Sequence, residues 1–266
     1  MAIKKSGGKV KSAAANPAPG EQSALGGLME TGRTIIFAVL FAVVVRTFAY
    51  EPFNIPSGSM IPTLLIGDYL FVSKFSYGYS RHSLPFSLPL IEGRVFESIP
   101  ERGDVAVFKL PSDNQTDYIK RIIGLPGDKV QVIRGVLYIN DKPVRRRRIE
   151  DFGQQTDTGR FMAAPQFRET LPNGVVHSIL EEYGDSGPLD NTGVFVVPDG
   201  HYFAMGDNRD NSSDSRVVES VGFIPAENLV GRAEILFFST NGFARIWEIW
   251  KWPFTVRFKR ILNSID

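Results

Sequence analysis

The chain has 266 residues, of which 43% are hydrophobic and 12% aromatic, so it can form one large domain or two modest ones around a sizeable core. Its formal net charge of +1 gives no bias toward nucleic acid, and we expect no nucleic-acid partner. Cysteine is absent, which excludes disulfides, thiolate catalysis and cysteine-ligated metals. The three histidines, His82, His177 and His201, are widely spaced, so we expect no metal site and no other cofactor.

The N-terminal part of the chain combines a polar tail with an apolar run. Residues 1–24 are rich in Ala, Gly, Ser, Pro and Lys, and we expect a disordered tail over residues 1–33. Residues 34–50, TIIFAVLFAVVVRTFAY, would span about 26 Å as a helix, near the lower limit for a bilayer. A buried soluble helix and a cleaved signal peptide are the alternatives. We expect an uncleaved transmembrane helix, because the run is continuously apolar and the tail is long for a signal peptide.

Basic residues indicate how this helix is oriented. Five of them precede the apolar run: Lys4, Lys5, Lys9, Lys11 and Arg33. By the positive-inside rule they keep the N-terminus cytoplasmic. Residues 51–266 are then expected to form an extracytoplasmic domain.

Residues 51–64, EPFNIPSGSMIPTL, place two serines around a glycine and between two prolines. Pro56 and Pro62 stiffen the backbone, and Gly58 allows close approach of another chain. A hydroxyl such as that of Ser59, held on rigid backbone beside a free N–H, suits the nucleophile of an acyl transfer. A plain surface turn has the same composition, so this stretch alone does not decide.

The remainder of the chain reads as short strands separated by turns. The expected strands are residues 69–74, 104–109, 117–123, 129–133, 136–139, 193–203 and 230–238. We therefore expect a mainly β domain with an antiparallel, barrel-like sheet and few helices. Residues 141–192 are polar and loop-like, and we interpret them as a smaller inserted segment.

Three further stretches leave two interpretations each. Residues 77–90 form a proline-broken apolar loop that covers the core or rests in a membrane interface. The arginine run 145–148 is a solvated loop or a contact for anionic headgroups. The tryptophan-rich tail, residues 246–260, suits a bilayer interface or a docked terminal strand.

Lys120 is the candidate general base. Strand alternation in DYIKRIIG, residues 117–124, puts Tyr118, Lys120 and Ile122 on one face. If that face is interior, loss of water lowers the pKa of Lys120 toward neutrality, and a neutral amine accepts a proton from a serine hydroxyl. An exposed or salt-bridged lysine is the common alternative.

Residues 206–216, GDNRDNSSDSR, form the third candidate motif. As a calcium loop starting at Asp207 it fails, because Arg209 falls at the third ligand position and Val218 at the twelfth. We expect a rigid, hydrogen-bonded and ion-paired turn that supports a nucleophile–base pair, with a plain polar loop as the alternative. A Ser-His-Asp set of Ser59, His201 and Asp207 is a further alternative.

In order along the chain, PSGSMxPTL, then RGDVxVF with DYIKRxxGLPGD, then GDNRDNSxDSR, behind an apolar anchor, closely resemble bacterial type I signal peptidases, the Ser-Lys serine proteases also called leader peptidases. The resemblance covers about residues 34–240. It implies that Ser59 is the nucleophile and Lys120 the general base. It also implies that the Ser57 hydroxyl belongs to the oxyanion hole and that Ser212 orients the lysine.

The resemblance implies supporting residues as well. Those expected to support the site structurally are Phe108, Arg121, Asp207, Asp214 and Arg216, with Asp207–Arg121 and Asp214–Arg216 as ion pairs. Those expected to line shallow substrate pockets are Phe53, Ile55, Pro56, Tyr118 and Ile119. Tyr118 and Phe108 would also desolvate the lysine.

The function implied by the resemblance is removal of signal peptides from secretory preproteins after small residues, of the Ala-x-Ala type. The partners would be these preproteins, the phospholipid membrane and, as a further candidate, the secretion machinery. The location would be the cytoplasmic membrane, with one pass and the catalytic domain outside. The chain has one apolar run where some relatives have two. A non-catalytic scaffold domain and a protease for pilus or organellar proteins are the alternatives.

Overall fold

The structure is a computed structural model that describes residues 21–84, 87–155 and 161–265. The chain divides into two compact units, residues 1–43 and residues 44–266. The expected disorder of residues 1–20 lies outside the described part of the chain.

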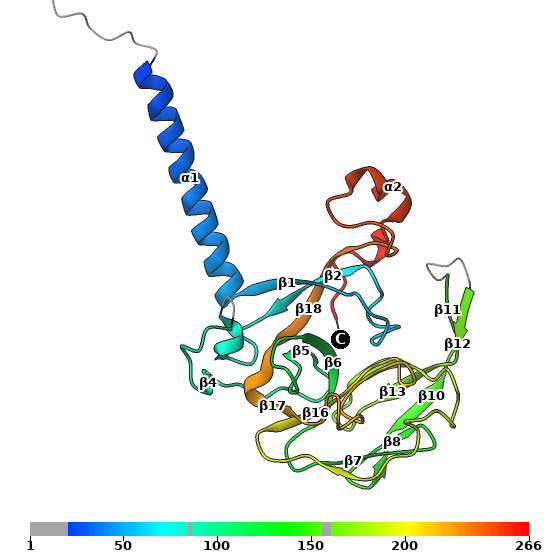
Figure 1. The fold of residues 1–266 in the computed structure, drawn as a ribbon. Helices are drawn as coiled ribbons and strands as arrows, with labels where there is room; N and C mark the ends of the chain where they lie inside the picture. Colours follow the sequence, from blue (N-terminus) through cyan, green and yellow to red (C-terminus); the bar gives the residue numbers. More distant parts are fainter. Residues whose placement is uncertain (1–20, 85–86, 156–160, 266) are drawn as a thin grey trace, which may run out of the picture. The chain divides into compact units, whose positions relative to one another are not determined.

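Helix α1 runs over Glu21–Phe48, and its stretch Gly27–Phe48 is long and apolar enough to cross a membrane (Figure 1). The 22 residues of that stretch span about 33 Å. The prediction of a disordered tail up to residue 33 is wrong for residues 21–33, which are helical. Good helix formers in this segment, among them Glu21, Leu25 and Met29, favour the longer helix. The helix also ends before the expected residue 50, because Tyr50 already opens a strand.

One antiparallel sheet of seven strands forms the centre of the second unit (Figure 1). In spatial order its strands are β1 (Tyr50–Asn54), β2 (Asp68–Ser73), β18 (Leu229–Ser239), β5 (Val105–Lys109), β6 (Asp117–Gly124), β16 (His201–Met205) and β17 (Ile224–Pro225). This arrangement confirms the predicted mainly β, antiparallel fold class. Register shifts bend β18 against both of its neighbours, and the sheet curls as a result.

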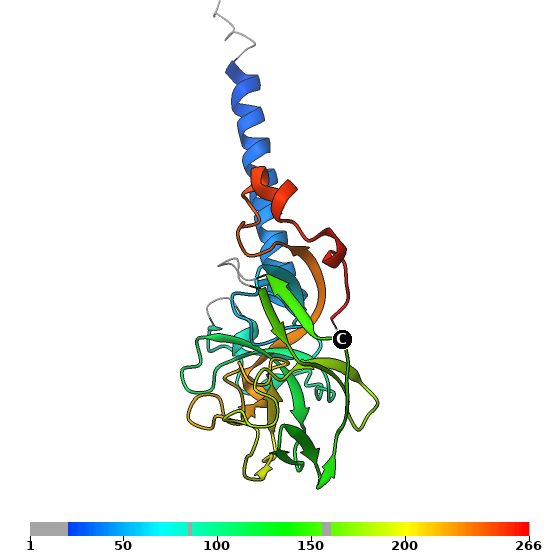
Figure 2. The same ribbon diagram turned by 90° about the vertical axis from the view of Figure 1, so that its right-hand side faces the viewer.

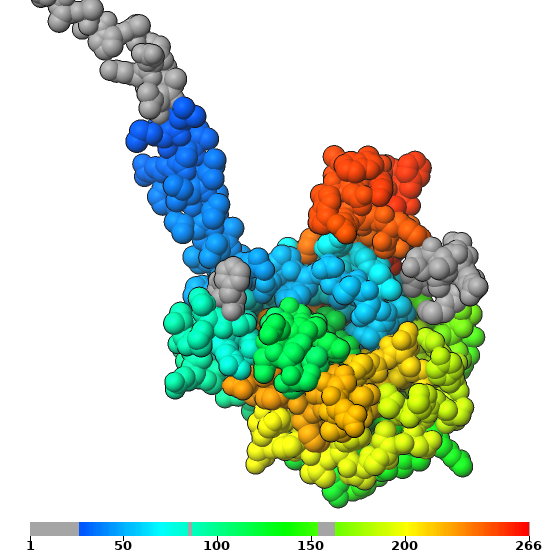
Figure 3. All heavy atoms as spheres, viewed as in Figure 1, coloured from blue at the N-terminus to red at the C-terminus, as the bar shows by residue number. Residues whose placement is uncertain are grey.

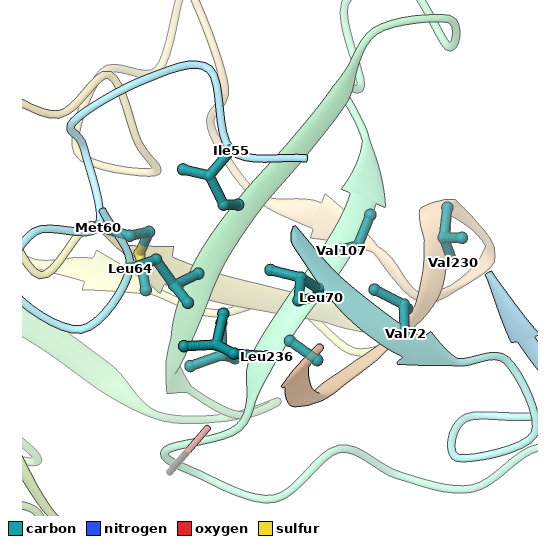
Figure 4. Packing of buried hydrophobic residues seen from close by; sticks show 10 residues of the cluster. Ile55, Met60, Leu64, Leu70, Val72, Val107, Val230 and Leu236 are labelled. Atoms are coloured by element: carbon teal, nitrogen blue, oxygen red, sulfur yellow. The ribbon is translucent and has the colours of Figure 1, made fainter. Parts of the chain in front are cut away.

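The segment that follows β1 packs into an apolar cluster against this sheet. Met60 and Leu64 are fully buried, and Ile55 is buried beside them (Figure 4). They pack against β2, β5 and β18 through residues such as Leu70 and Val107. Burying a side chain of this size stabilises the fold by about 1.5–3 kcal/mol. The serines of the segment are therefore fixed by apolar anchors on both sides.

The segment 141–192 was predicted to be loop-like, and this prediction is wrong. Its strands are β9 (Lys142–Pro143), β10 (Arg145–Arg148), β11 (Phe152–Gln155), β12 (Phe161–Ala164), β13 (Gln166–Thr170) and β14 (Val176–Leu180). Strands β10, β13 and β14 form one small sheet, and β11 and β12 form a hairpin. The sequence does not announce these strands, because β10 is a run of four arginines and because β11, β12 and β9 are only two to four residues long.

The arginine run, expected as a loop, is strand β10. Alternation turns Arg146 and Arg148 toward the ring of Phe167, at 4.7 Å and 5.3 Å from its centroid. Beside this sheet lies a second small one of β15 (Phe195–Val196), β7 (Lys129–Ile133), β8 (Val136–Ile139) and β9. Strands β7 and β8 lie at the end of the second unit opposite α2 (Figures 1 and 2).

The tryptophan-rich tail is docked on the second unit, but not as a strand. It forms the short helices η4 (Ile249–Lys251), α2 (Trp252–Thr255) and η5 (Phe258–Arg260), which Figure 3 shows as an orange-red lobe. Trp252 packs against Phe238, with ring centroids 4.8 Å apart and the ring planes tilted by 48°. Trp247 and Trp250 are exposed, as an interface role would require.

Residues 77–90 contain both a buried and an exposed part. Strand β3 (Tyr79–Ser80) lies in this segment and pairs with β4 (Arg94–Val95). The short helix η1 (Arg81–Ser83) directly follows β3. Elsewhere in the chain, the short helix η3 (Ala226–Asn228) precedes β18. Tyr77 and His82 are buried, whereas Leu88 and Leu90 are exposed. Residues 85–86 lie outside the described chain.

Candidate active site

A cleft of about 570 Å³ opens where the segment after β1 faces strand β6. It is lined by Phe53, Asn54, Ile55, Pro56, Ser57, Gly58, Ser59, Val107, Thr116, Asp117, Tyr118, Ile119, Lys120, Asn211 and Ser213. Its exposed walls are mainly apolar, and its polar side chains include three serines and one lysine. Small-molecule and peptide sites typically have this composition.

Ser59 and Lys120 meet in this cleft. The Oγ of Ser59 and the Nζ of Lys120 are 2.8 Å apart, within hydrogen-bond distance. Both residues are buried, with 9% and 4% of their surface exposed. Lys120 Nζ also donates to the carbonyl oxygen of Ile119 at 2.9 Å and lies 5.2 Å from the ring centroid of Tyr118. A nucleophile and a base in direct contact are what general-base catalysis requires.

The surroundings of Lys120 favour its neutral form. Burial lowers the pKa of Lys120 to about 8, although the charges of Asp214 and Asp207 act in the opposite direction. Phe108, predicted to help desolvate the lysine, is fully buried, and its ring lies 6.1 Å from that of Tyr118. A pKa in this range means that the Lys120 amine loses its proton, and with it its charge, at mildly alkaline pH.

The turn at residues 206–216 is in direct contact with Ser59. The carbonyl oxygen of Ser59 accepts a hydrogen bond from the N–H of Asn208 at 3.1 Å. A Cβ at Gly206 would lie 2.2 Å from Ser212 Oγ and 2.5 Å from Ser59 O. No side chain fits there, so glycine at position 206 permits the turn to close over the serine.

The two other predicted serines lie beside the pair. Ser57 is exposed and lines the cleft two residues before Ser59. Ser212 is buried with its Oγ against Gly206. Among the contacts of the described residues, a hydrogen bond from Ser212 to Lys120 is not present.

Two buried ion pairs stiffen the same turn. Arg121 binds Asp207 through two hydrogen bonds of 2.9 Å and 2.8 Å, and both side chains are fully buried. Arg216 binds Asp214 in the same bidentate way, with both bonds at 2.9 Å. Burial alone would raise the pKa of Asp207, but Arg121 outweighs this and holds the pKa below its ordinary value. Both predicted pairs are thus brought together.

The five residues predicted to line substrate pockets all border the cleft: Phe53, Ile55, Pro56, Tyr118 and Ile119. Six further residues line the cleft that the sequence did not single out: Asn54, Val107, Thr116, Asp117, Asn211 and Ser213. A signal was present for all but Thr116, since the other five lie within the motifs quoted above.

His201 is not part of this arrangement. It opens strand β16, its Nδ1 lies 2.9 Å from the carbonyl oxygen of Asp199, and it does not border the cleft. The carboxylate of Asp207, its supposed triad partner, is occupied by Arg121 and Thr63. The described contacts therefore give Ser59 a lysine and not a histidine as its partner.

Comparison with known proteins identifies the family. The family model described as "Signal peptidase, peptidase S26" matches residues 28–238. A signal peptidase I from Rickettsia typhi is 47% identical over 212 residues, which cover 77% of this chain and 78% of that protein. A signal peptidase I from Rickettsia prowazekii is 46% identical over 212 residues, with the same coverage of 77% and 78%.

A crystal structure of a signal peptidase I from Enterococcus faecalis V583 also matches, with 25% sequence identity and a TM-score of 0.30, covering 51% of this chain and 97% of that one. The resemblance read from the three motifs is confirmed by the family match and by the Rickettsia relatives. On these grounds, the chain belongs to the signal peptidase family, peptidase S26, whose members are serine proteases that remove signal peptides.

Proposed function

We propose that this chain is a membrane-anchored endopeptidase that cuts signal peptides from secretory preproteins with Ser59 as nucleophile and Lys120 as general base. The observation that carries the proposal is the 2.8 Å approach of Ser59 Oγ to Lys120 Nζ inside a cleft. The lowered pKa of Lys120 supports it, since a base must be free of its proton to act.

The chemistry follows from this pair. Neutral Lys120 takes the proton of Ser59 as Oγ attacks the scissile carbonyl carbon. The carbonyl oxygen becomes an oxyanion, which the Ser59 N–H and the Ser57 hydroxyl bind; one such donor contributes on the order of 3 kcal/mol. Lys120 then gives its proton to the leaving amine and the C–N bond breaks. A water molecule, deprotonated by Lys120, hydrolyses the acyl-enzyme.

The substrate would enter as an extra strand. On one side β6 pairs with β5 from Asp117 to Arg121. On the other side β16 pairs with β6 only from Arg121 onward, so in the described chain no strand covers that edge at residues 117–119. An extended peptide can add its backbone hydrogen bonds there. Phe53, Ile55 and Ile119 border the cleft beside this edge and would limit the size of the neighbouring side chains.

The location follows from the helix. The apolar stretch Gly27–Phe48 would anchor the chain in the cytoplasmic membrane, with the N-terminus inside and the catalytic domain outside. The preprotein, its signal segment held in the same membrane, would meet the cleft there. The exposed Trp247 and Trp250 would rest at the lipid interface, where indole rings are favoured.

The direct test is cleavage by the purified full chain in detergent. We expect one cut in a preprotein, after an Ala-x-Ala sequence, identified by N-terminal sequencing of the product. Replacing the alanine before the cut by phenylalanine should slow cleavage about 100-fold or more, because Phe53, Ile55 and Ile119 would limit the size of the side chain bound beside them. A chain that leaves the preprotein intact, or cuts both substrates equally, would contradict the proposal and favour the scaffold alternative.

The pH dependence of the reaction gives a second test. Because burial lowers the pKa of Lys120 to about 8, the free base predominates only above that pH. We expect kcat/KM for preprotein cleavage to rise about tenfold per pH unit below pH 8 and to level off above it. The measurement is kcat/KM from pH 6 to pH 10. A rise centred near the ordinary lysine value of 10.5 would show that Lys120 is not the desolvated base.

A further inference from the structure

Three carboxylates meet outside the catalytic cleft. Glu181 follows strand β14, Asp190 lies in the turn before β15, and Asp210 belongs to the 206–216 turn. One oxygen from each lies within 4.8 Å of an oxygen from each of the others. Glu181 and Asp190 are each 1% exposed, so two of the three acids are removed from water.

In each of these carboxylates, one oxygen accepts a hydrogen bond and the other oxygen has no hydrogen-bond donor. Glu181 Oε1 accepts from Arg146 at 3.4 Å, Asp190 Oδ2 from the N–H of Gly187 at 2.5 Å, and Asp210 Oδ2 from the N–H of Tyr183 at 2.8 Å. The opposite oxygens, Glu181 Oε2, Asp190 Oδ1 and Asp210 Oδ1, are buried and have no hydrogen-bond partner in the described chain. Leaving such an oxygen unpaired is unfavourable, so a ligand that binds all three would stabilise the fold.

The backbone is shaped to bring these acids together. A Cβ at Gly187 would lie 2.2 Å from Asp210 Oδ1 and 3.0 Å from Asp190 Oδ2. Glycine therefore lets two carboxylates approach over its Cα. A parallel bridge joins Leu180 and Asn208, and the N–H of Arg209 donates to the Leu180 carbonyl at 3.0 Å. These contacts fix the residues that directly precede Glu181 and Asp210.

Of the two nearby arginines, only Arg146 binds one of the three acids, at 3.4 Å from Glu181. Arg146 is shared with Asp185 at 2.7 Å, and Arg209 is bound to Glu169 at 2.5 Å. In the described chain, the buried oxygens Glu181 Oε2, Asp190 Oδ1 and Asp210 Oδ1 are therefore not met by any positively charged side chain. A shared proton joins only two carboxylates, whereas a metal cation joins all three.

The geometry points to a divalent cation site formed by Glu181, Asp190 and Asp210, with calcium as its ion. Calcium prefers carboxylate and carbonyl oxygens at about 2.3–2.6 Å in flexible geometry, which suits oxygens from three separate segments within 4.8 Å of one another. The ion would tie the segment after β14 and the turn before β15 to the 206–216 turn. Asp210 is followed directly by Asn211, which lines the catalytic cleft, so the cation would also steady one wall of that cleft.

The test is calcium binding by the full-length protein in detergent, and it needs no proteolysis. For a site with a dissociation constant of about 0.1–1 mM, adding about 5 mM CaCl₂ to chelator-treated protein should raise the unfolding temperature by about 3 °C or more. Equilibrium dialysis with calcium should then show one ion per chain. Glu181→Gln and Asp210→Asn should abolish both the rise and the binding.

The matched control is Asp199→Asn, which removes an exposed carboxylate outside the cluster and should keep the full calcium response. If Glu181→Gln does not fold, the calcium response of Asp210→Asn is the deciding measurement, because Asp210 is partly exposed. The inference is overturned if the wild-type protein shows no calcium response, if both cluster variants keep it, or if about 5 mM MgCl₂ stabilises more than calcium does.

Discussion

Replacing Ser59 by alanine is expected to lower kcat/KM for preprotein cleavage by about 10⁵-fold, the scale on which serine proteases lose activity without their nucleophile. The substitution removes only the Oγ that lies 2.8 Å from Lys120 Nζ. The backbone position should not change, because Met60 and Leu64 remain buried as anchors. Unfolding temperature and preprotein binding should therefore stay close to those of the wild-type protein, while the chemical step is lost.

Two other serines of the cleft give matched controls for Ser59→Ala. Ser213→Ala removes an exposed hydroxyl from the same cleft and should leave kcat/KM within about twofold, as is usual for surface substitutions. Ser57→Ala should lower kcat by about 10²–10³-fold, because it removes one oxyanion donor and leaves the nucleophile. Activity of Ser59→Ala within tenfold of the Ser213→Ala variant would eliminate Ser59 as the nucleophile.

Lys120→Met is the second substitution with a very large expected effect. Methionine has nearly the same length, fills the same buried volume and cannot accept a proton. We expect kcat/KM to fall by about 10⁴-fold or more and the rise of activity near pH 8 to disappear. A variant that keeps the wild-type pH profile would show that another group is the base.

Stability measured on the same variant separates catalysis from folding. The pKa of Lys120 is lowered in the folded state from 10.5 to about 8, so protonation opposes folding. This unfavourable contribution is fully present below pH 8 and disappears as the pH rises through 10.5. Lys120→Met should thus unfold at a higher temperature than the wild-type protein at pH 6, with little difference above pH 10. Lys74→Met is a suitable comparison, because this other buried lysine is paired with Glu51 at 2.8 Å and its loss should destabilise the fold.

Local patterns in the sequence placed several strands, but the single strand expected over residues 193–203 is wrong, since β15 and β16 are separated there by a turn. The alternation in residues 117–124 put Lys120 on the face that carries Tyr118, and Lys120 Nζ lies 5.2 Å from the centroid of the Tyr118 ring. The β-branched runs likewise matched β2, β5, β7 and β8 within a residue. These features depend on neighbours in the chain, which a sequence displays directly.

The errors arose where distant parts of the chain decide the outcome. Strands β10 to β14 are short and are formed by pairing with one another, and this pairing is not visible in the local sequence of residues 141–192. The acids Glu181, Asp190 and Asp210 belong to three segments and to no spaced motif, so their convergence appears only in the folded chain. The start of helix α1 at Glu21 has a different cause, because its first residues are good helix formers but are not continuously apolar.

The uncovered edge of β6 at residues 117–119 has a wider consequence for the range of chains this cleft can accept. A strand edge binds a peptide through backbone amide and carbonyl groups, which every polypeptide has. Binding to such an edge therefore requires that the peptide adopt an extended conformation and depends little on its amino-acid sequence. Discrimination is then left to the few positions whose side chains turn inward. The proposed binding mode would let a single enzyme process many different exported polypeptides, each of which would need only a short stretch of compatible residues.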